Sequence, residues 1–199
     1  GRQHENDREA TAADLKWLAD PAEEPEPFGD GGTKMAWNTF NVVSIYPNGN
    51  PVMSDVNQRW VGDCCACAVI ASMAYLYPRF VKHIIKDNMD KTYTVTMYDP
   101  KGKQISVGVG DDYFIGNSGD LGALGGRNKE VTWATILEKA MIKWNQIYQG
   151  SSNVGGIGTE YVSAIFTGDG ESVGFGANAV IAEDLQRAVE VSLKQGRLV

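Results

Sequence analysis

The 199-residue sequence has few of the residues that usually mark a metal site or a disulfide framework. It contains three cysteines, Cys64, Cys65 and Cys67, and two histidines, His4 and His83. A structural zinc site usually needs four Cys or His ligands in paired spacings, and the cysteine cluster has no fourth ligand nearby. Neighbouring residues of a helix also cannot easily adopt disulfide geometry. We therefore expect the three thiols neither to bind zinc nor to form disulfides.

The sequence also lacks an excess of positive charge and a long apolar run. It has 18 Lys and Arg against 25 Asp and Glu, which gives a net charge of −7 at pH 7. Binding to the phosphate backbone of a nucleic acid needs a basic face, so we expect no nucleic-acid partner. The longest apolar run, 64–76, is interrupted by Ser72 and is shorter than the roughly 18 residues that a spanning helix requires. No transmembrane segment is expected.

The two ends of the chain differ in composition from its middle. Residues 1–33 are polar, acidic and rich in Glu, Pro and Gly, which predicts a flexible N-terminal arm with one short helical stretch at 10–19. The chain starts at Gly1 without a methionine, which favours an exported protein whose signal has been removed. Free thiols fit a reducing cytoplasm, which is the alternative location. The apolar end, 198–199, suggests a strand that continues into a further lobe.

The middle of the chain alternates between periodic apolar segments and long glycine-rich loops. Residues 93–99 and 103–112 predict a β-hairpin, because β-rich runs flank the turn signal at 100–102. Apolar spacing predicts helices, and glycine-rich stretches predict loops. The expected helices cover 64 to 75–77, 78–88, 131–148 and 183–196, and the expected loops cover 116–128 and 150–170. The sequence thus indicates an α+β fold that is mostly helical, with a small hairpin, over residues 34–199.

Cys64 differs from the other two cysteines in its position. It follows Gly62 and Asp63 at the predicted start of a helix, where unpaired N–H groups and the helix dipole stabilise a thiolate. Such a thiolate is a common nucleophile at neutral pH. Gln58, six residues upstream, can fold back and donate a hydrogen bond to an oxyanion, together with the Cys64 N–H.

Short motifs of this kind are weak on their own. On the residues alone, an alternative stays open in which Cys64 is a buried thiol and Gln58 an ordinary loop residue. Cys65 and Cys67 are expected to pack as small apolar core residues, which is a common fate of free cysteine.

Four segments of the sequence resemble the calpain family of papain-like cysteine proteases. Residues 55–73, DVNQRWVGDCCACAVIASM, are similar to the family's active-site pattern Q-G-x-x-G-D-C-W and the apolar helix after it. WATILEKAMIKWNQIY at 133–148 resembles W-x-x-L-L-E-K-A-Y-A-K-x-x-G-x-Y, and GGIGTEYVSAIFTGDG at 155–170 resembles G-G-x-x-x-E-x-x-x-x-F-T-G-G. VGVGDDYF at 107–114 resembles the strand end V-x-V-D-D-x-L-P. The segments occur in the family order and cover roughly 55–196.

The resemblance implies the first, nucleophile-bearing lobe of a papain-like protease. By the matching positions, Cys64 is the nucleophile, Gln58 the oxyanion-hole donor, and Gly156 a residue that binds the substrate backbone. The implied reaction is hydrolysis of peptide bonds in proteins or peptides through a thioester, and it needs no cofactor. Two alternatives stay open: a non-catalytic calpain-like interaction module, and acyl or amide transfer by the same thiolate.

The resemblance also implies calcium as a regulator. Asp55 falls where an acidic residue helps to bind calcium in the regulated members, and Glu130 matches a second acidic ligand with an offset of about one position. A calcium site needs six to eight oxygen donors, and two carboxylates alone do not supply them. The alternative is that both carboxylates are solvated loop charges.

Two positions depart from the family pattern, and two catalytic groups are not found. Cys65 stands where the family has a tryptophan, and Arg59 where it has a glycine, which suggests a changed substrate rim. The family supplies its general-base His and its orienting Asn from a second lobe downstream. We expect these groups on such a lobe, or on a companion chain that autoprocessing has separated by cleavage. His83 falls on the wrong lobe and His4 in the N-terminal arm.

Overall fold

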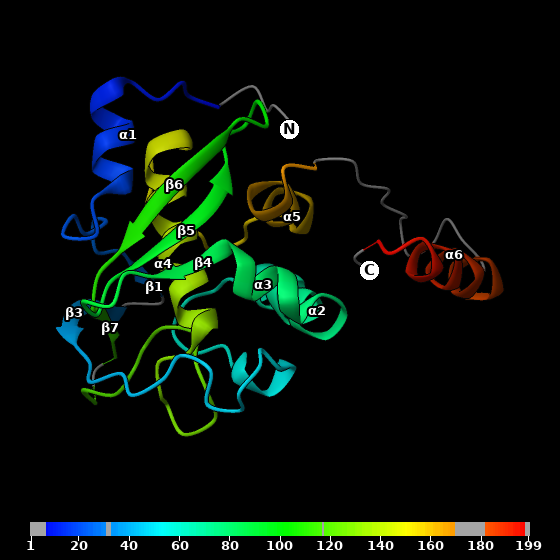
Figure 1. Cartoon of the computed structure of the whole chain (residues 1–199), viewed down its shortest axis with the longest axis horizontal. Helices are drawn as coiled ribbons and strands as arrows, with labels where there is room; N and C mark the ends of the chain where they lie inside the picture. The colour runs from blue at the N-terminus through cyan, green and yellow to red at the C-terminus, as the bar shows by residue number, and fades with distance from the viewer. Residues whose placement is uncertain (1–6, 31–32, 117, 170–181, 198–199) are drawn as a thin grey trace.

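The computed structural model describes residues 7–30, 33–116, 118–169 and 182–197 of the chain (Figure 1). The described elements form an α+β fold of helices, one short 3-10 turn and small antiparallel sheets. In chain order they are α1 (Ala12–Ala19), β1 (Gly29–Asp30), β2 (Thr33–Lys34), β3 (Ala36–Thr39), η1 (Met53–Asp55), α2 (Cys64–Leu76), α3 (Pro78–Ile84), β4 (Ile85–Asp87), β5 (Tyr93–Tyr98), β6 (Gln104–Val109), β7 (Asp112–Ile115), α4 (Trp133–Tyr148), α5 (Thr159–Thr167) and α6 (Ala182–Lys194).

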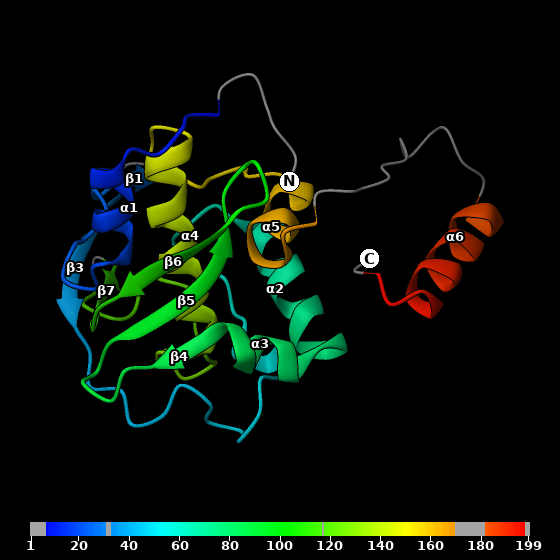
Figure 2. The ribbon, with the colours of Figure 1, turned by 45° about the horizontal axis from the view of Figure 1, so that its top comes forward.

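Helix α4 is the centre of the core. Its first turn is capped by Thr132, whose hydroxyl accepts a hydrogen bond from the Ala134 N–H at 3.3 Å. Every residue of α4 except Gln146 and Ile147 is buried. Strands β5 and β6 pack on one side of it, and α1 contacts both α4 and β6 (Figures 1 and 2). The predicted helix 131–148 is therefore confirmed, and it is enclosed on all sides rather than amphipathic at a surface.

The predicted hairpin is confirmed and belongs to a three-stranded sheet. β5 pairs antiparallel with β6, and Tyr93, Val95 and Met97 alternate into the core with the period of two that a half-buried strand requires. β4 adds a third strand, since Ile85 pairs with Val95. The helix expected over 78–88 is therefore correct only for α3, because the chain turns into the sheet after Ile84. A separate pair joins β3 to β7, and another joins β1 to β2.

Helix α5 lies where the sequence predicts a loop. Its side chains Val162, Ile165 and Phe166 are buried at helical spacing, and the helix packs on α2 and β5. It ends at Gly168, whose φ of 76° is the left-handed conformation that favours glycine at a helix end. The prediction of an unbroken loop over 150–170 was wrong, because the glycines on both sides of this short segment hid its apolar periodicity.

The N-terminal segment also differs from the expectation. Over residues 7–30 the predicted flexible arm is folded onto the domain: α1 begins with a reciprocal capping box between Thr11 and Asp14, and the Leu18 side chain is fully buried. Gly108 of β6 permits this contact. A Cβ atom there would lie 2.4 Å from the Ala19 carbonyl oxygen.

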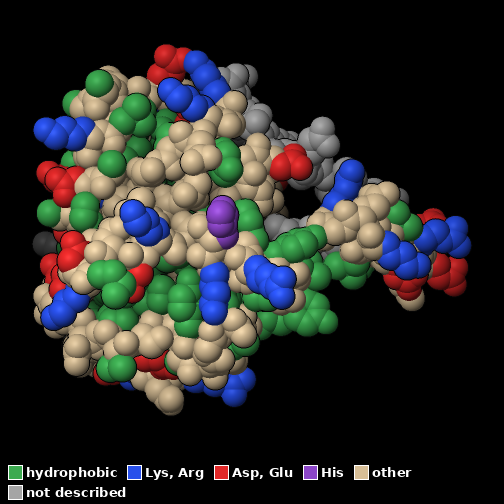
Figure 3. Space-filling model, in the orientation of Figure 1, with side chains coloured by type: hydrophobic (Ala, Val, Ile, Leu, Met, Phe, Trp, Pro, Cys, Tyr) green, Lys and Arg blue, Asp and Glu red, His purple; other side chains and the backbone are tan. Residues whose placement is uncertain are grey.

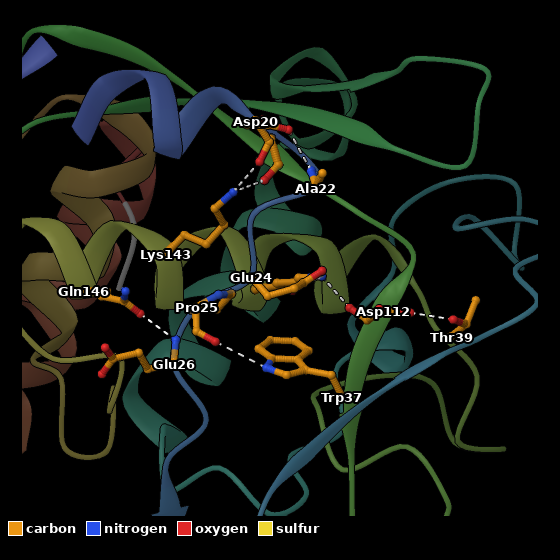
Figure 4. A network of polar contacts seen from close by, with 12 residues as sticks. Asp20, Ala22, Glu24, Pro25, Glu26, Trp37, Thr39, Asp112, Lys143 and Gln146 are labelled. Atoms are coloured by element: carbon orange, nitrogen blue, oxygen red, sulfur yellow. Dashed lines mark hydrogen bonds and ion pairs between the residues drawn. The ribbon is translucent and has the colours of Figure 1, made fainter. Parts of the chain in front are cut away.

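Two lysines of α4, Lys139 and Lys143, hold this segment in place, and Figure 4 shows Lys143 beside Asp20. The Lys143 ammonium donates to the carbonyl oxygens of Asp20 and Gly108, each at 2.8 Å. The Lys139 ammonium lies 2.7 Å from a carboxylate oxygen of Glu24. Both lysines are almost fully buried, so these partners replace water that the ammonium groups lose on folding. Polar composition alone predicts flexibility, but these specific partners order the segment.

Helix α6 lies apart from the rest of the described elements, and none of its residues is buried (Figures 1 and 2). It stops just before Gly196, whose φ is 73°, so the predicted helix and its stop are both confirmed. The Tyr77 hydroxyl donates to the Gly196 carbonyl oxygen. Hydrophobic side chains gather on the surface next to α6 (Figure 3). On α2, the Tyr75 side chain is 73% exposed.

No single helix among the described residues is long and apolar enough to cross a bilayer. Helices α2 and α3 reach the required length and composition only when taken together, and the chain bends by 112° between them.

Candidate active site

Cys64 is the first residue of α2 and its side chain is exposed. The first N–H groups of a helix have no partner within the helix and point outward at its positive end. A negative charge on the Cys64 sulfur, or on a carbonyl oxygen beside it, is stabilised there. The position therefore suits a thiolate nucleophile, as the sequence predicts.

Gln58 lies on the loop that leads to Cys64, and its side chain is oriented. Its Nε2 donates to the carbonyl oxygen of Val61 at 2.9 Å. An amide nitrogen carries two hydrogens, so this bond leaves one for another acceptor.

The backbone of the Gln58 loop is fixed by the glycine-rich loop before α4. Asn57 and Gly125 exchange two backbone hydrogen bonds, of 2.9 and 3.3 Å, and the Trp60 N–H donates to the Gly122 carbonyl at 3.1 Å. Both residues that flank the Gln58 and Arg59 pair are thus tied to the same partner loop. A donor on such a fixed loop is already ordered before a ligand arrives.

Gly156 lies beside the segment that precedes Cys64. Its backbone N–H donates to the Gly62 carbonyl oxygen at 3.1 Å, and its φ is 74°. A Cβ atom added at Gly156 would have no neighbouring atom within 4 Å, so this side of the loop is open. The next residue back is held as well, since the Gly155 N–H donates to the Asn153 side chain at 2.8 Å. The open backbone leaves room for an extended peptide.

Cys65 and Cys67 are each half-buried. Cys67 packs against the hydrophobic core, as expected, whereas Cys65 is not part of that packing among the described residues. The Cys67 thiol donates to a carboxylate oxygen of Asp63 at 3.5 Å. Burial, together with the charges of Asp63 and Glu138, raises the pKa of the Cys67 thiol. Burial and the neighbouring Cys64 raise the pKa of the Cys65 thiol. Both side chains are therefore held as neutral thiols, which are poor nucleophiles.

A pair of buried carboxyl groups lies behind Cys64, and the sequence analysis did not find it. Asp63 and Glu138 are each 1% exposed, and each carboxyl group acts on the pKa of the other. Burial raises the pKa of Asp63 to about 6 and that of Glu138 further above its ordinary value. No sequence signal marked this pair, because Glu138 lies outside the apolar face that Ile136, Leu137 and Met141 form, and its burial depends on contacts from the rest of the fold.

Asp55 is buried and accepts hydrogen bonds from three protein donors. One oxygen accepts from the Asn48 side chain at 2.8 Å, and the other accepts from the Trp133 indole at 2.7 Å and the Val52 N–H at 3.2 Å. Both oxygens are therefore satisfied by groups that join the Gln58 loop to the start of α4. This arrangement is that of a structural anchor, and a cation would have to displace neutral donors from it.

Glu130 is half-buried and lies over Gly126, where an added Cβ atom would lie 2.0 Å from a Glu130 carboxylate oxygen. Within the described ranges, no group of three or more His, Cys, Asp or Glu side chains is placed to hold a metal ion. The residues present do not fit a calcium site of six to eight oxygen donors around Asp55 and Glu130. Calcium regulation stays a prediction from the resemblance.

Arg59 and Trp60, the two residues after Gln58, both contact the glycine-rich loop before α4. The Arg59 guanidinium donates to the Gly126 carbonyl oxygen. The Trp60 ring lies against Gly116, where an added Cβ atom would be 2.2 Å from the indole nitrogen. The arginine that replaces the family's glycine therefore adds a link between the Gln58 loop and the glycine-rich loop.

The described residues do not contain a complete catalytic triad. His83 is exposed on α3, and in the described part of the chain no hydrogen bond joins it to the Cys64 thiol. His4 lies outside the described residues. The described residues thus present an exposed thiol at the start of α2 and a Gln58 amide on the loop before it, whereas a general base for Cys64 is not found among them.

Comparison with known proteins identifies the family. A model of the calpain family of cysteine proteases matches residues 36–198, which is most of the chain. The chain therefore belongs to the calpain family of cysteine proteases, and membership implies a cysteine peptidase domain that acts on protein substrates. The matched range includes Gln58, Cys64 and Gly156 and begins after α1. A search of curated proteins found no match.

Proposed function

We propose that this chain is the nucleophile-bearing part of a cysteine endopeptidase. One observation supports it above the others. The Gln58 side chain bonds to Val61 and the Gly156 backbone bonds to Gly62, so both functional loops meet at the two residues that precede Asp63 and Cys64. An oxyanion donor, a peptide-binding backbone and a nucleophile are thereby held by one short segment.

The proposed reaction starts with attack of the Cys64 thiolate on the scissile carbonyl carbon. The carbonyl oxygen becomes an oxyanion, which accepts hydrogen bonds from the Gln58 amide and the Cys64 N–H. The tetrahedral intermediate then collapses, the amine leaves with a proton, and a thioester to Cys64 remains. Water hydrolyses the thioester, which releases the acid product and regenerates the thiol.

The proton transfers need a general base, which we propose is a histidine on a second lobe or on a companion chain. The proposal rests on the exposed position of Cys64 and on the lack of a histidine bonded to it among the described residues. A second polypeptide surface that covers Cys64 would complete the site. An orienting asparagine would come from the same surface.

A non-catalytic interaction module is the second candidate function. Cys65 stands where the family has a tryptophan, and it is half-buried directly beside Cys64. A lost ring at this position removes packing near the catalytic groups, which is the observation that favours the second candidate.

Turnover of casein or a fluorogenic peptide, measured in the complete protein with Cys64→Ala and Cys65→Ser variants, separates the two functions. The peptidase proposal predicts that Cys64→Ala abolishes turnover and that Cys65→Ser retains it. It also predicts that iodoacetamide labels Cys64 ahead of Cys65 and Cys67. No turnover by the unmodified protein, together with equal labelling of all three thiols, would establish the interaction module instead.

A further inference from the structure

Two acidic side chains are buried against each other directly behind the start of α2. Asp63 and Glu138 are each 1% exposed, and their carboxyl groups lie close enough to act on each other's pKa. Glu138 Oε2 accepts a hydrogen bond from the Leu124 N–H at 2.9 Å, and one Asp63 oxygen accepts from the Cys67 thiol. The other Asp63 oxygen, Oδ2, has no hydrogen-bond donor among the described residues.

The missing donor is explained by a proton on the pair. Two ionised carboxylates repel each other when they are buried together, and they cannot form a hydrogen bond without a proton between them. In the described part of the chain, no Lys, Arg or His acts on either carboxyl group. A single shared proton gives the pair a charge of −1 and supplies the missing donor.

The groups around the pair and the neighbouring thiols come from three helices, α2, α4 and α5, and from the loop at 121–126. Helix α2 contributes the Cys67 thiol, with the Cys64 and Cys65 thiols in the same turn. Helix α4 contributes Glu138 itself, and the loop at 121–126 contributes only the backbone N–H of Leu124. Glu160, at the start of α5, acts on Cys65. Every charged group in this set is acidic, so nothing there neutralises a second carboxylate.

The pair connects both halves of the candidate active site. Asp63 directly precedes Cys64, and Glu138 holds the loop at 121–126 through Leu124. That loop in turn pairs with the loop of Gln58, through Gly125 and Asn57. The nucleophile and the oxyanion donor are therefore both positioned from one buried pair.

We propose that Asp63 and Glu138 are positioning residues for the peptidase reaction: an acid–carboxylate pair that shares one proton and sets the place and the charge environment of Cys64. The proposal rests on the proposed function of Cys64 as the nucleophile. When the shared proton is lost, two negative charges lie behind the helix start where the thiolate and the oxyanion form. That change opposes both anions and also strains the contact between α2 and α4.

The test compares the unmodified protein with Glu138→Gln between pH 5 and 9. Glutamine keeps the shape of Glu138 and can donate a hydrogen bond to Asp63 without a titrating proton. The matched control is Glu190→Gln, which removes the same charge from the exposed surface of α6. Two readouts are taken: the rate at which iodoacetamide alkylates Cys64, resolved by peptide mass spectrometry, and the midpoint of thermal unfolding.

We expect the alkylation rate of Glu138→Gln, relative to the unmodified protein, to rise by about tenfold from pH 6 to pH 9, the change that corresponds to one pKa unit of interaction. We also expect the unfolding midpoint of Glu138→Gln, minus that of the unmodified protein, to increase from pH 6 to pH 9. Glu190→Gln should show neither trend. Asp63→Asn removes the titration from the other side and should reproduce both trends if Glu138→Gln does not fold.

The outcomes separate this proposal from the proposed function. A gain in the unfolding midpoint without any change in the Cys64 pH profile means that the pair is only structural, and this overturns the positioning role. Identical pH dependence of both readouts in all variants overturns the shared proton. If Cys64 is not labelled ahead of the other thiols, the nucleophile assignment fails, while the unfolding midpoints still decide whether the pair shares a proton.

Discussion

The backbone N–H of Gly156 donates to the carbonyl oxygen of Gly62, so two glycines far apart in the sequence hold the candidate substrate loop against the segment that leads to Cys64. Gly156 adopts a φ of 74° with open space around it. Substitutions can therefore separate two effects of Gly156: the strain that a side chain causes at this φ, and the contribution of its position to peptide binding.

Gly156→Ala is expected to lower the free energy of unfolding by about 1–2 kcal/mol, because an L-residue is strained in the left-handed region. Gly49→Ala is a matched control, since Gly49 has a φ of 77° and is equally open, and its carbonyl oxygen accepts from Lys82 of α3 instead of bonding to the segment before Cys64. Both variants should show a similar loss in urea titrations. Only Gly156→Ala should also reduce peptide turnover, and an equal loss of turnover in both would contradict a substrate role for Gly156.

Gln58→Ala is expected to reduce kcat by about 100- to 1,000-fold, because an oxyanion donor acts mainly in the transition state. The unfolding midpoint should change little, since the Gln58 side chain is exposed and bonds only to its own loop. Steady-state kinetics with a fluorogenic peptide provide the measurement, and Gln186→Ala, at an exposed position of α6, is the matched control. A change confined to KM would argue against the oxyanion role.

Asp55→Asn is expected to lower the free energy of unfolding by about 2 kcal/mol, because an amide nitrogen cannot accept the hydrogen bonds that a buried carboxylate oxygen accepts. The loss should be the same in calcium and in EDTA, since the partners of Asp55 are Trp133, Asn48 and Val52. Asp90→Asn, in an exposed turn, is the control. A midpoint that rises with calcium in the unmodified protein, and not in Asp55→Asn, would instead support the calcium ligand that the family resemblance implies.

Because of Lys143, we expect the free energy of unfolding to increase with pH above about pH 8. Burial lowers the pKa of Lys143 from 10.5 to about 8. Between these two values the unfolded chain binds a proton that the folded chain has released, so raising the pH favours the folded state. The unfolding midpoint of the unmodified protein should therefore gain on that of Lys143→Met from pH 8 to pH 10. Lys86→Met, at an exposed position, should show no such trend.

The sequence predicted those elements whose patterns are local. The alternation of Tyr93, Val95 and Met97 predicted the hairpin, and the apolar face of 131–148 predicted α4. Helix α5 was missed because glycines surround it. The docking of residues 7–30 was missed because it depends on Lys139 and Lys143, which look like ordinary charges in an amphipathic helix until their partners are known.

The candidate site was predicted only in part for a similar reason. The position of Cys64 at a helix start follows from the local sequence, whereas the partners of Asp63 and Asp55 come from α4, far along the chain. The sequence does not distinguish a buried carboxyl group, whose partners come from far along the chain, from one that is exposed to solvent. Burial and contact across the fold distinguish the two.

The contacts of Lys139 and Lys143 with residues 20–24 make the N-terminal segment part of the folded domain. The family match begins at residue 36, but the Lys143 ammonium shares its protons between Asp20 and β6, and Glu24 pairs with Lys139. A protein shortened to residues 36–198 would keep Lys139 and Lys143 but lose the Glu24 carboxylate and the Asp20 carbonyl oxygen that bind them. A stably folded fragment is therefore expected to include α1, and residues 7–30 act as internal scaffolding of the calpain-family domain.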